Sequence, residues 1–326
     1  MIKMNDRDKI LETINQEQTF YLVSHMQPDG DSIGSLLAMG EGLRSLGKQV
    51  RMFAPDQVPQ KYLFLEGSEL VFQEVLFEDP EVTVVVLDSS DLERLSFFKE
   101  AVLTGRKIIN IDHHVTNQQF GNYNLVDPEA AATGEIIFDL LNELGAQLTK
   151  GAAESLFVAI ATDTGSFKYE NTTPQTHRVV ASLLEYGLNP GALSQKIFDE
   201  RPLSFYMLLK DALAALEIYE GGKIALSTLS KDIRERSGAS SGDLEGIVNY
   251  TRDIVGVELG ILFYVESESE VKVGFRSKQV DVSVLAGKFN GGGHARAAGC
   301  RLYEDFRTVK QKVLKEALDM LKELSV

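Results

Sequence analysis

Short apolar runs alternate with helical patterns through the first half of the chain. Strand-like runs lie at 20–23, 49–53, 82–87 and 107–111, and several are nearly continuous and β-branched, as in a parallel sheet buried on both faces. Helices are predicted at 32–46, 57–65, 133–144, 150–162 and 174–186. This alternation predicts an α/β fold with a mainly parallel sheet flanked by helices.

The pattern changes after Gly187. Residues 191–216 are predicted to be helical and to carry the linker. Strand-like runs follow at 214–219, 223–229, 257–265 and 270–276, with helices near 240–251, 281–288 and 304–324. We therefore expect a first domain over 1–186, linker helices over 187–213 and a smaller α/β domain over 214–326.

Composition and charge exclude several classes of protein. The single cysteine excludes an intramolecular disulfide and a cysteine-based zinc site. No apolar run approaches the roughly 18 residues of a membrane span, and the charged N-terminus lacks a signal-peptide core, so we expect a cytoplasmic protein without membrane association. The net charge of −15 would be repelled by nucleic-acid phosphates, which argues against duplex DNA as a partner.

Candidate chemistry begins directly after the first apolar strand. His25, Asp29 and Asp31 present one imidazole and two carboxylates within seven residues, and Gly30 lets the backbone fold them together. In α/β sheets, ligands bind beyond the carboxyl ends of strands, where this turn lies. The alternative is a simple turn in which Asp31 or Ser32 caps the next helix.

Two further strand ends and one helix end carry the same residue types. Asp88 ends a buried strand, where a carboxylate is costly unless it is paired or bound to a metal. His113 and His114 follow another strand; adjacent residues point in different directions, so we expect one to bind a metal and the other to meet a substrate. Asp163 closes an apolar helix, where its charge opposes the helix dipole and suggests a compensating cation. The alternative to these roles is that the two histidines lie exposed in a loop and that Asp163 is solvated.

Together, these positions supply four aspartates and two histidines as candidate metal ligands: His25, Asp29, Asp31, Asp88, His113 and Asp163. Oxygen-rich ligation with imidazole and no thiolate favours Mn²⁺, Mg²⁺ or Co²⁺ over structural zinc. The set is large enough for two ions that share one carboxylate. Such a pair of ions can activate a water and neutralise a phosphoryl group.

The same motifs resemble those of the DHH phosphoesterase superfamily, in the family's order: His25-x3-Asp29-Gly30-Asp31, Asp88, Asp112-His113-His114 and Asp163. The second half resembles a DHH-associated C-terminal domain, through the runs 245–252, 274–278, 281–283 and 291–299. Within the superfamily, the chain is most similar to the bacterial bifunctional oligoribonucleases (nanoRNases) that are also pAp phosphatases.

The resemblance implies a role for each motif residue. One metal would be held by His25, Asp29 and Asp88, and the other by Asp31, Asp88, His113 and Asp163, with Asp88 as the bridge. His114 would contact the scissile phosphate or the leaving oxygen, and Asp112 would orient the histidines.

In the second domain, the candidate substrate-binding residues are Arg276, Gly291, Gly292, Gly293 and His294. The three glycines expose N–H groups that can form an anion-binding nest, and Arg276 offers a planar fork suited to a terminal phosphate. The alternatives are that the three glycines form a flexible loop and that Arg276 is a solvated strand residue.

The implied activity is hydrolysis by a hydroxide that two Mn²⁺ ions activate, with Mg²⁺ or Co²⁺ as alternative ions. Its substrates would be short single-stranded RNA, releasing nucleoside monophosphates, and the bisphosphate 3′-phosphoadenosine 5′-phosphate (pAp), releasing AMP and phosphate. One alternative is a phosphodiesterase for linear dinucleotides such as pApA or pGpG; another is a catalytically silent nucleotide-binding sensor. Analogy with the family allows a homodimer.

Overall fold

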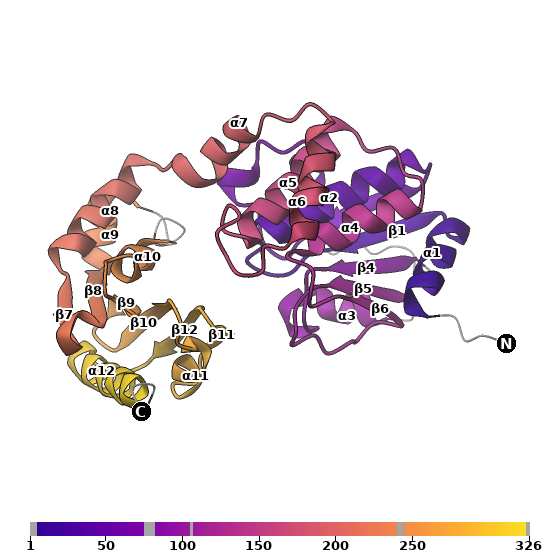
Figure 1. Ribbon diagram of the computed structural model, residues 1–326. Coiled ribbons are helices and arrows are strands. Elements are labelled where there is room, and N and C mark those ends of the chain that lie inside the picture. The colour runs from indigo at the N-terminus through magenta and orange to yellow at the C-terminus, as the bar shows by residue number, and fades with distance from the viewer. Residues whose placement is uncertain (1–4, 75–81, 105–106, 240–243, 245, 324–326) are drawn as a thin grey trace. The chain divides into compact units, whose positions relative to one another are not determined.

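The chain forms two compact units, residues Met1–Glu200 and Arg201–Val326, in the computed structural model (Figure 1). The structure describes residues 5–74, 82–104, 107–239, 244 and 246–323. Each unit is built around a sheet of its own, with hydrophobic clusters against both faces of that sheet. The predicted α/β fold is confirmed.

A six-stranded sheet, parallel throughout, forms the centre of the N-terminal unit, in the order β3-β2-β1-β4-β5-β6. Its strands are β1 (Thr19–Val23), β2 (Gln49–Phe53), β3 (Val71–Phe72), β4 (Thr83–Leu87), β5 (Ile108–Asp112) and β6 (Tyr123–Val126). The four predicted runs form β1, β2, β4 and β5. The order reverses between β1 and β4, which makes that point the topological switch of the sheet, where α/β proteins bind ligands.

Helices cover both faces of this sheet because successive side chains of a strand point to opposite sides. Phe20 and Leu22 of β1 join the larger core with α2, α4, α5 and α6, whereas Tyr21 and Val23 join the smaller core with α3. The helices are α1 (Asp6–Gln16), α2 (Gly30–Ser45), α3 (Phe98–Leu103), α4 (Thr133–Glu143), α5 (Lys150–Asp163), α6 (Pro174–Leu184) and α7 (Pro190–Ser194). The 3₁₀ turns are η1 (Gln60–Tyr62), η2 (Ser68–Leu70) and η3 (Glu93–Leu95), and a π-helical turn, η4 (Gln195–Asp199), follows α7.

Prolines account for two wrong helix predictions. The predicted helix at 57–65 is only the 3₁₀ turn η1, because Pro59 has no N–H and restricts the residue before it. The predicted helix at 191–216 ends at η4 and starts again at α8 (Leu203–Ala214), because Pro202 is extended between them, with ψ of 155°.

A mixed six-stranded sheet forms the C-terminal unit, in the order β11-β12-β10-β9-β8-β7. Only β8 and β9 pair in parallel among these neighbours of the described chain. Its strands are β7 (Glu217–Tyr219), β8 (Ile224–Ser230), β9 (Leu259–Ser267), β10 (Glu270–Ser277), β11 (Gly292–His294) and β12 (Ala297–Leu302). The 3₁₀ turn η5 (Glu220–Gly222) joins β7 to β8.

The helices of the C-terminal unit also lie on both faces of its sheet. Helices α11 (Val282–Gly287) and α12 (Phe306–Glu323) pack on one core, and helices α8 and α10 (Ile247–Arg252) pack on the other. The short helix α9 (Lys231–Ser237) follows β8. Of the helix predicted at 240–251, residues 240–243 and 245 lie outside the described residues.

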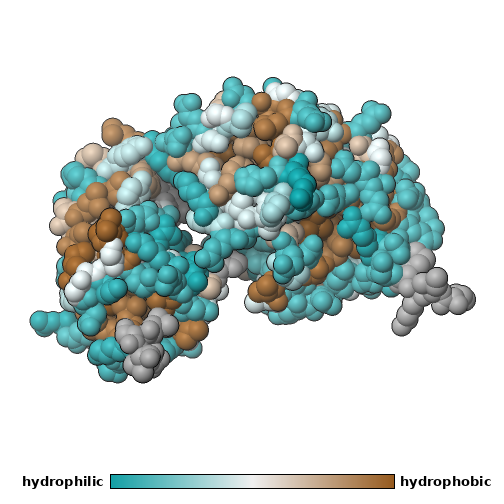
Figure 2. Space-filling model, in the orientation of Figure 1, coloured by the Kyte–Doolittle hydropathy of each residue, from teal (hydrophilic) through white to brown (hydrophobic). Residues whose placement is uncertain are grey.

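The outer surface is mixed in character. On the face seen in Figure 2, hydrophilic residues predominate and hydrophobic residues form smaller separate areas, which is normal for folded proteins. No helix in the described part of the chain is long and apolar enough to cross a membrane.

Candidate metal centre

The six predicted metal ligands come together in the N-terminal unit. β1, β4 and β5 are neighbours in the sheet, and their carboxyl ends lead to His25, Asp88 and His113, respectively. Asp29 and Asp31 lie at the start of α2, and Asp163 is the last residue of α5. Three groups of ligand atoms lie within 4.8 Å of one another: His25 with Asp29 and Asp88, Asp31 with His113 and Asp163, and Asp88 with His113 and His114.

Asp88 occupies the middle of this cluster and is 2% exposed. Its Oδ2 lies 3.3 Å from Nε2 of His25, and its Oδ1 lies 3.8 Å from Nε2 of His113. The hydroxyl of Thr133 donates a 3.0 Å hydrogen bond to Oδ1. The φ angle of Asp88 is 56°, a left-handed conformation that few non-glycine residues adopt and that aspartate adopts more readily than most. Two oxygens that face two different histidines are what a bridging carboxylate requires.

The N-terminus of α4 holds Asp31 in place. The backbone N–H groups of Thr133 and Gly134 donate to its two oxygens at 2.6 and 3.0 Å, and the helix dipole favours a negative charge there. The hydroxyl of Ser35, one turn along α2, donates a further 3.0 Å bond. Asp31 is therefore a fixed link between α2 and α4.

Asp29 combines a candidate ligand position with a structural role. Its Oδ1 accepts a 3.0 Å hydrogen bond from the N–H of Ser32, so Asp29 is the N-cap of α2. The alternative of a cap by Asp31 or Ser32 is wrong, because Asp31 already lies inside the helix.

Main-chain carbonyls fix the tautomers of His25 and His113. Their Nδ1 atoms lie 2.7 Å from the carbonyl oxygen of Met26 and 3.3 Å from that of Ala130, respectively. A carbonyl only accepts, so each Nδ1 donates and each Nε2 directs a lone pair at the carboxylates of the cluster. Acceptors that face acceptors repel each other unless a cation or proton lies between them. The donor set therefore fits divalent metal ions.

Electrostatics point to the same conclusion. Burial raises the pKa of Asp31. Burial, and after it the charges of neighbouring aspartates, raise the pKa values of Asp88 and Asp163 well above the usual range. Burial lowers the pKa of His25, which favours its neutral, metal-binding form. A divalent ion would remove the repulsion that raises the carboxyl pKa values.

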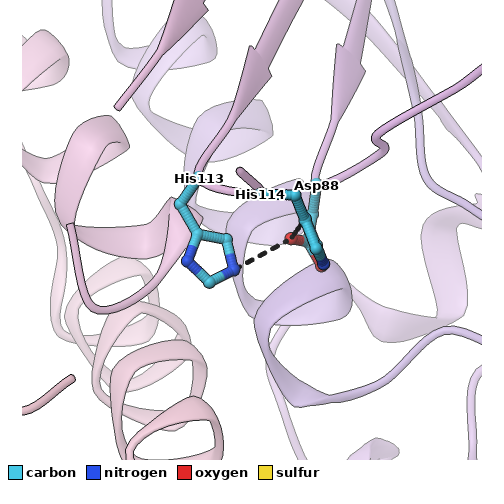
Figure 3. Close-up of side chains that lie close together, drawn as sticks. All are labelled: Asp88, His113 and His114. Atoms are coloured by element: carbon cyan, nitrogen blue, oxygen red, sulfur yellow. Dashed lines mark ion pairs between the residues drawn. The ribbon is translucent and has the colours of Figure 1, made fainter. Parts of the chain in front are cut away.

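The rings of His113 and His114 both face Asp88 instead of diverging as expected (Figure 3). Their centroids are 4.7 Å apart with the planes at 60°. Their Nδ1 atoms have different partners: that of His113 donates to the carbonyl of Ala130, and that of His114 donates a 2.6 Å hydrogen bond to Asp112. Burial alone would raise the pKa of Asp112, but hydrogen bonds from His114 and Asn117 hold that pKa below its usual value.

Four residues near the ligands were not predicted: Arg94, Asn110, Asn117 and Thr133. Nδ2 of Asn117 donates to Asp112 at 2.6 Å and to Oδ1 of Asn110 at 2.8 Å. Asn110 interrupts the apolar run of β5, and a buried polar residue of this kind is a signal that sequence reasoning could have used. Thr133 and Arg94 reach the ligands only through the tertiary fold and have no motif of their own.

The candidate substrate-binding residues occupy neighbouring strands of the C-terminal unit. Ala297 of β12 pairs with His294 of β11 on one side and with Arg276 of β10 on the other, so these positions form one row across the sheet. Arg276 is half-buried, and its Nη1 donates a 2.9 Å hydrogen bond to the carbonyl of Phe275.

Packing explains two of the three glycines in this region. A Cβ at Gly291 would overlap the carbonyl oxygen of Gly299, and one at Gly293 would lie 2.5 Å from the carbonyl oxygen of Ala297. A Cβ at Gly292 would meet no atom of the described chain within 4 Å. Gly292 and Gly293 belong to β11, so the glycine run is part of a hairpin with β12.

Comparison with known proteins identifies the family. Residues 19–160 match the DHH family, N-terminal domain, and residues 221–325 match the DHHA1 domain. A bifunctional oligoribonuclease and PAP phosphatase NrnA of Thermus thermophilus is 36% identical over 291 residues, which cover 88% of this chain and 85% of the relative. A protein of the same name from Bacillus subtilis is 29% identical over 300 residues, covering 91% and 93%.

A solved structure extends the likeness to the fold. An exopolyphosphatase-related protein from Bacteroides fragilis matches with a TM-score of 0.89 at 26% identity, over 98% of this chain and 96% of the other. The resemblance to the DHH phosphoesterase superfamily is therefore confirmed. The chain belongs to the DHH family, with a DHH N-terminal domain followed by a DHHA1 domain.

Proposed function

We propose that this protein is a metal-dependent phosphoesterase that hydrolyses short RNA oligonucleotides to nucleoside monophosphates and pAp to AMP and phosphate. The observation that carries the proposal is the convergence of two histidine lone pairs and four carboxylates in one cluster at the switch point of a parallel sheet. The names of the relatives from Thermus thermophilus and Bacillus subtilis support the choice of substrates.

In this proposal the cluster holds two divalent ions. His25, Asp29 and Asp88 would bind one; Asp31, Asp88, His113 and Asp163 would bind the other. The ligand chemistry favours Mn²⁺, with Mg²⁺ and Co²⁺ as alternatives. When bound, a pair of such ions lowers the pKa of a water and neutralises charge on a phosphoryl group.

His114 is the proposed contact to the scissile phosphate or leaving oxygen. Its Nδ1 donates to Asp112, which holds the ring beside Asp88. In the reaction, a water molecule loses a proton and its oxygen bonds to phosphorus, the bond to the leaving oxygen breaks, and that oxygen takes up a proton. Asp112 is itself held by Asn117, so the His114 ring is positioned before the substrate arrives.

The C-terminal unit supplies the proposed substrate contacts. Arg276, Gly291, Gly292, Gly293 and His294 would bind the nucleotide or a terminal phosphate, with Arg276 offering a planar guanidinium group. The N–H of Gly291 donates to the carbonyl oxygen of Ala286 at 2.9 Å, so any N–H contact to the substrate would come from the residues after it. Residues 1–186 would form the catalytic domain, 187–213 the linker helices and 214–326 the substrate-binding domain. The net charge of −15 supports short substrates over duplex DNA. A cytoplasmic location and a homodimer stay predictions.

Product analysis with Mn²⁺ tests the proposal. The substrates are 5′-labelled RNAs of about two to twenty-four nucleotides, pAp, the linear dinucleotides pApA and pGpG, and pyrophosphate as a control. We expect rapid loss of the shortest RNAs and release of phosphate from pAp. Turnover of the dinucleotides alone would favour the phosphodiesterase alternative. Binding of pAp without turnover of any substrate would favour the sensor.

A further inference from the structure

Arg94 is a cation in direct contact with a predicted metal ligand. It lies in η3, just after β4, and its Nη2 is 3.0 Å from Nδ1 and 3.3 Å from Nε2 of His25. An atom this close to both ring nitrogens lies against the ring and not at the end of one lone pair. Nδ1 already donates to Met26, so Nε2 is the only acceptor that the ring offers.

The backbone around Arg94 is anchored to the ends of two strands. Its carbonyl accepts a 2.7 Å hydrogen bond from the N–H of Met26, which follows β1. Asp91, in the turn after β4, accepts hydrogen bonds from the N–H groups of Glu93 and Arg94 at 2.9 and 3.1 Å. Arg94 is therefore held beside His25 by the fold on both sides of the switch point.

The charge of Arg94 forms no ion pair with a carboxylate in the described part of the chain. The residue is half-buried. A divalent ion bound by Nε2 of His25 would be a like charge at close range. An anion with several oxygens can neutralise both, because a guanidinium binds phosphate oxygens through two parallel N–H donors.

We propose that Arg94 is a phosphate-binding residue that makes metal binding and phosphate binding cooperative. Without an anion, its charge opposes the ion at His25; with a phosphate bound, it favours that ion. Linkage then requires that the metal tighten phosphate binding by the same factor. This inference rests on the metal sites of the proposed function and adds a residue that neither the motifs nor the candidate ligand set contains.

The test is a Mn²⁺ titration in which electron paramagnetic resonance measures free Mn²⁺, with and without inorganic phosphate. For the unmodified protein we expect phosphate to tighten Mn²⁺ binding about tenfold, within the range typical of coupled sites. In Arg94→Ala, Mn²⁺ should bind a few-fold more tightly without phosphate, and the phosphate effect should fall below about twofold. Arg94→Gln, which keeps most of the side-chain length without the charge, should behave in the same way.

Arg178→Ala is the matched control. Arg178 is exposed on α6, where its Nη1 donates to Gln175 at 3.3 Å, and its removal changes the net charge by the same amount. Its phosphate effect should equal that of the unmodified protein. The inference would be overturned if Arg178→Ala lost the effect of phosphate on Mn²⁺ affinity to the same degree. It would also be overturned if either Arg94 variant kept the full phosphate effect together with an unchanged circular dichroism spectrum.

Hydrolysis of pAp and short RNA is measured in parallel to separate the two proposals. If the Arg94 variants hydrolyse the substrates and show an unchanged effect of phosphate on Mn²⁺ affinity, only the role of Arg94 is rejected and the proposed function stands. Coupling that depends on Arg94, without turnover of either substrate, keeps that role and rejects the proposed function. Failure of the unmodified protein to bind Mn²⁺ rejects the metal sites and, with them, the inference.

Discussion

At the scale of single residues, Asp88 combines burial, a left-handed backbone and two oxygens that face different histidines. Burial of the charge and the left-handed backbone are both costly for such a residue. Burial, and after it the charges of neighbouring aspartates, raise the pKa of Asp88 well above its usual range. The cation that we propose at this position would offset the cost.

We predict that Asp88→Asn separates stability from activity. Asparagine adopts positive φ more readily than most residues and can still accept the hydrogen bond from Thr133. The metal-free variant should unfold at the same or a higher temperature, because a buried charge is gone. The Mn²⁺-induced rise in unfolding temperature should disappear, and hydrolysis of pAp should fall by at least about 100-fold, beyond the usual effect of residues outside the ligand shell.

Thermal unfolding with and without Mn²⁺, together with a phosphate-release assay, checks this prediction. The exposed residue Asp127 provides the control, since Asp127→Asn removes the same charge outside the six candidate ligands. Full activity in Asp88→Asn would contradict its role as a ligand. A marked loss of metal-free stability would contradict the argument from charge repulsion.

The glycines before His294 allow packing and substrate contact to be distinguished. Gly292→Ala should leave the free energy of unfolding within about 0.5 kcal/mol, because its Cβ meets open space. If the substrate approaches this backbone, KM for pAp should rise roughly tenfold, the equivalent of about 1.4 kcal/mol. Gly291→Ala should instead destabilise the unit by roughly 1–3 kcal/mol through overlap with Gly299.

Urea unfolding and steady-state kinetics on both variants give the readout. An unchanged KM in a stable Gly292→Ala variant would remove this backbone from the substrate-binding surface. A stable Gly291→Ala variant would show that the hairpin can relax.

At the scale of elements, the close approach of α2 and α5 sets the separation of the ligands. A Cβ at Gly34 would overlap the carbonyl oxygen of Ser155, and one at Gly30 would overlap the hydroxyl of Thr162. Since α2 begins beside Asp31 and α5 ends at Asp163, a wider helix pair would move carboxylates of the cluster apart.

We therefore predict that Gly34→Ala weakens both stability and metal binding. The free energy of unfolding should fall by roughly 1–3 kcal/mol, the usual cost of overpacking, and Mn²⁺ affinity should fall about tenfold, as for other changes that disturb ligand orientation. Gly191→Ala in α7 is the control. A Cβ at Gly191 would lie 3.5 Å from its nearest neighbour, Oδ1 of Asn189, and alanine should stabilise a helix by up to about 1 kcal/mol. Urea unfolding and isothermal titration with Mn²⁺ measure both effects; wild-type Mn²⁺ affinity in Gly34→Ala would count against this role of the helix pair.

At the scale of the whole molecule, the two units have separate hydrophobic cores and separate sheets. A ligand of one unit should therefore protect that unit first. We predict that Mn²⁺ alone slows amide hydrogen exchange around residues 24–31, 88–94 and 112–117 by at least about tenfold, because binding to the native state suppresses local opening. Exchange in β10 and β12 should not change until AMP is added.

Hydrogen-exchange mass spectrometry at fixed pH measures this difference directly. The metal-free protein provides the baseline, and the same experiment with Asp88→Asn is the control for specific binding. Equal protection of both units by Mn²⁺ alone would contradict the assignment of the metal sites to the N-terminal unit.

The sequence predicted those elements whose burial produces a clear pattern of apolar residues along the chain. The continuous apolar runs identified β1, β2, β4 and β5, whose side chains are buried on both faces or at one end. It missed β3, which has two residues, and β6, whose residues are all half-buried, because neither carries a distinct apolar pattern. The hairpin of β11 and β12 was missed for the same reason, whereas the N-terminal helix α1 was missed although Ile10 and Ile14 lie one turn apart and Asn5 caps it.

By itself, the sequence determined which residue types stand at the strand ends, and it identified the family through the order of those motifs. Periodicity reports whether a position is buried, and parallel strands place their carboxyl ends on one edge. Only the tertiary structure decided that β4 lies beside β1, that α4 presents Thr133 to Asp88, and that Arg94 lies against His25. The physical reason is that local patterns record burial, whereas contacts between residues far apart in the chain depend on how whole elements pack.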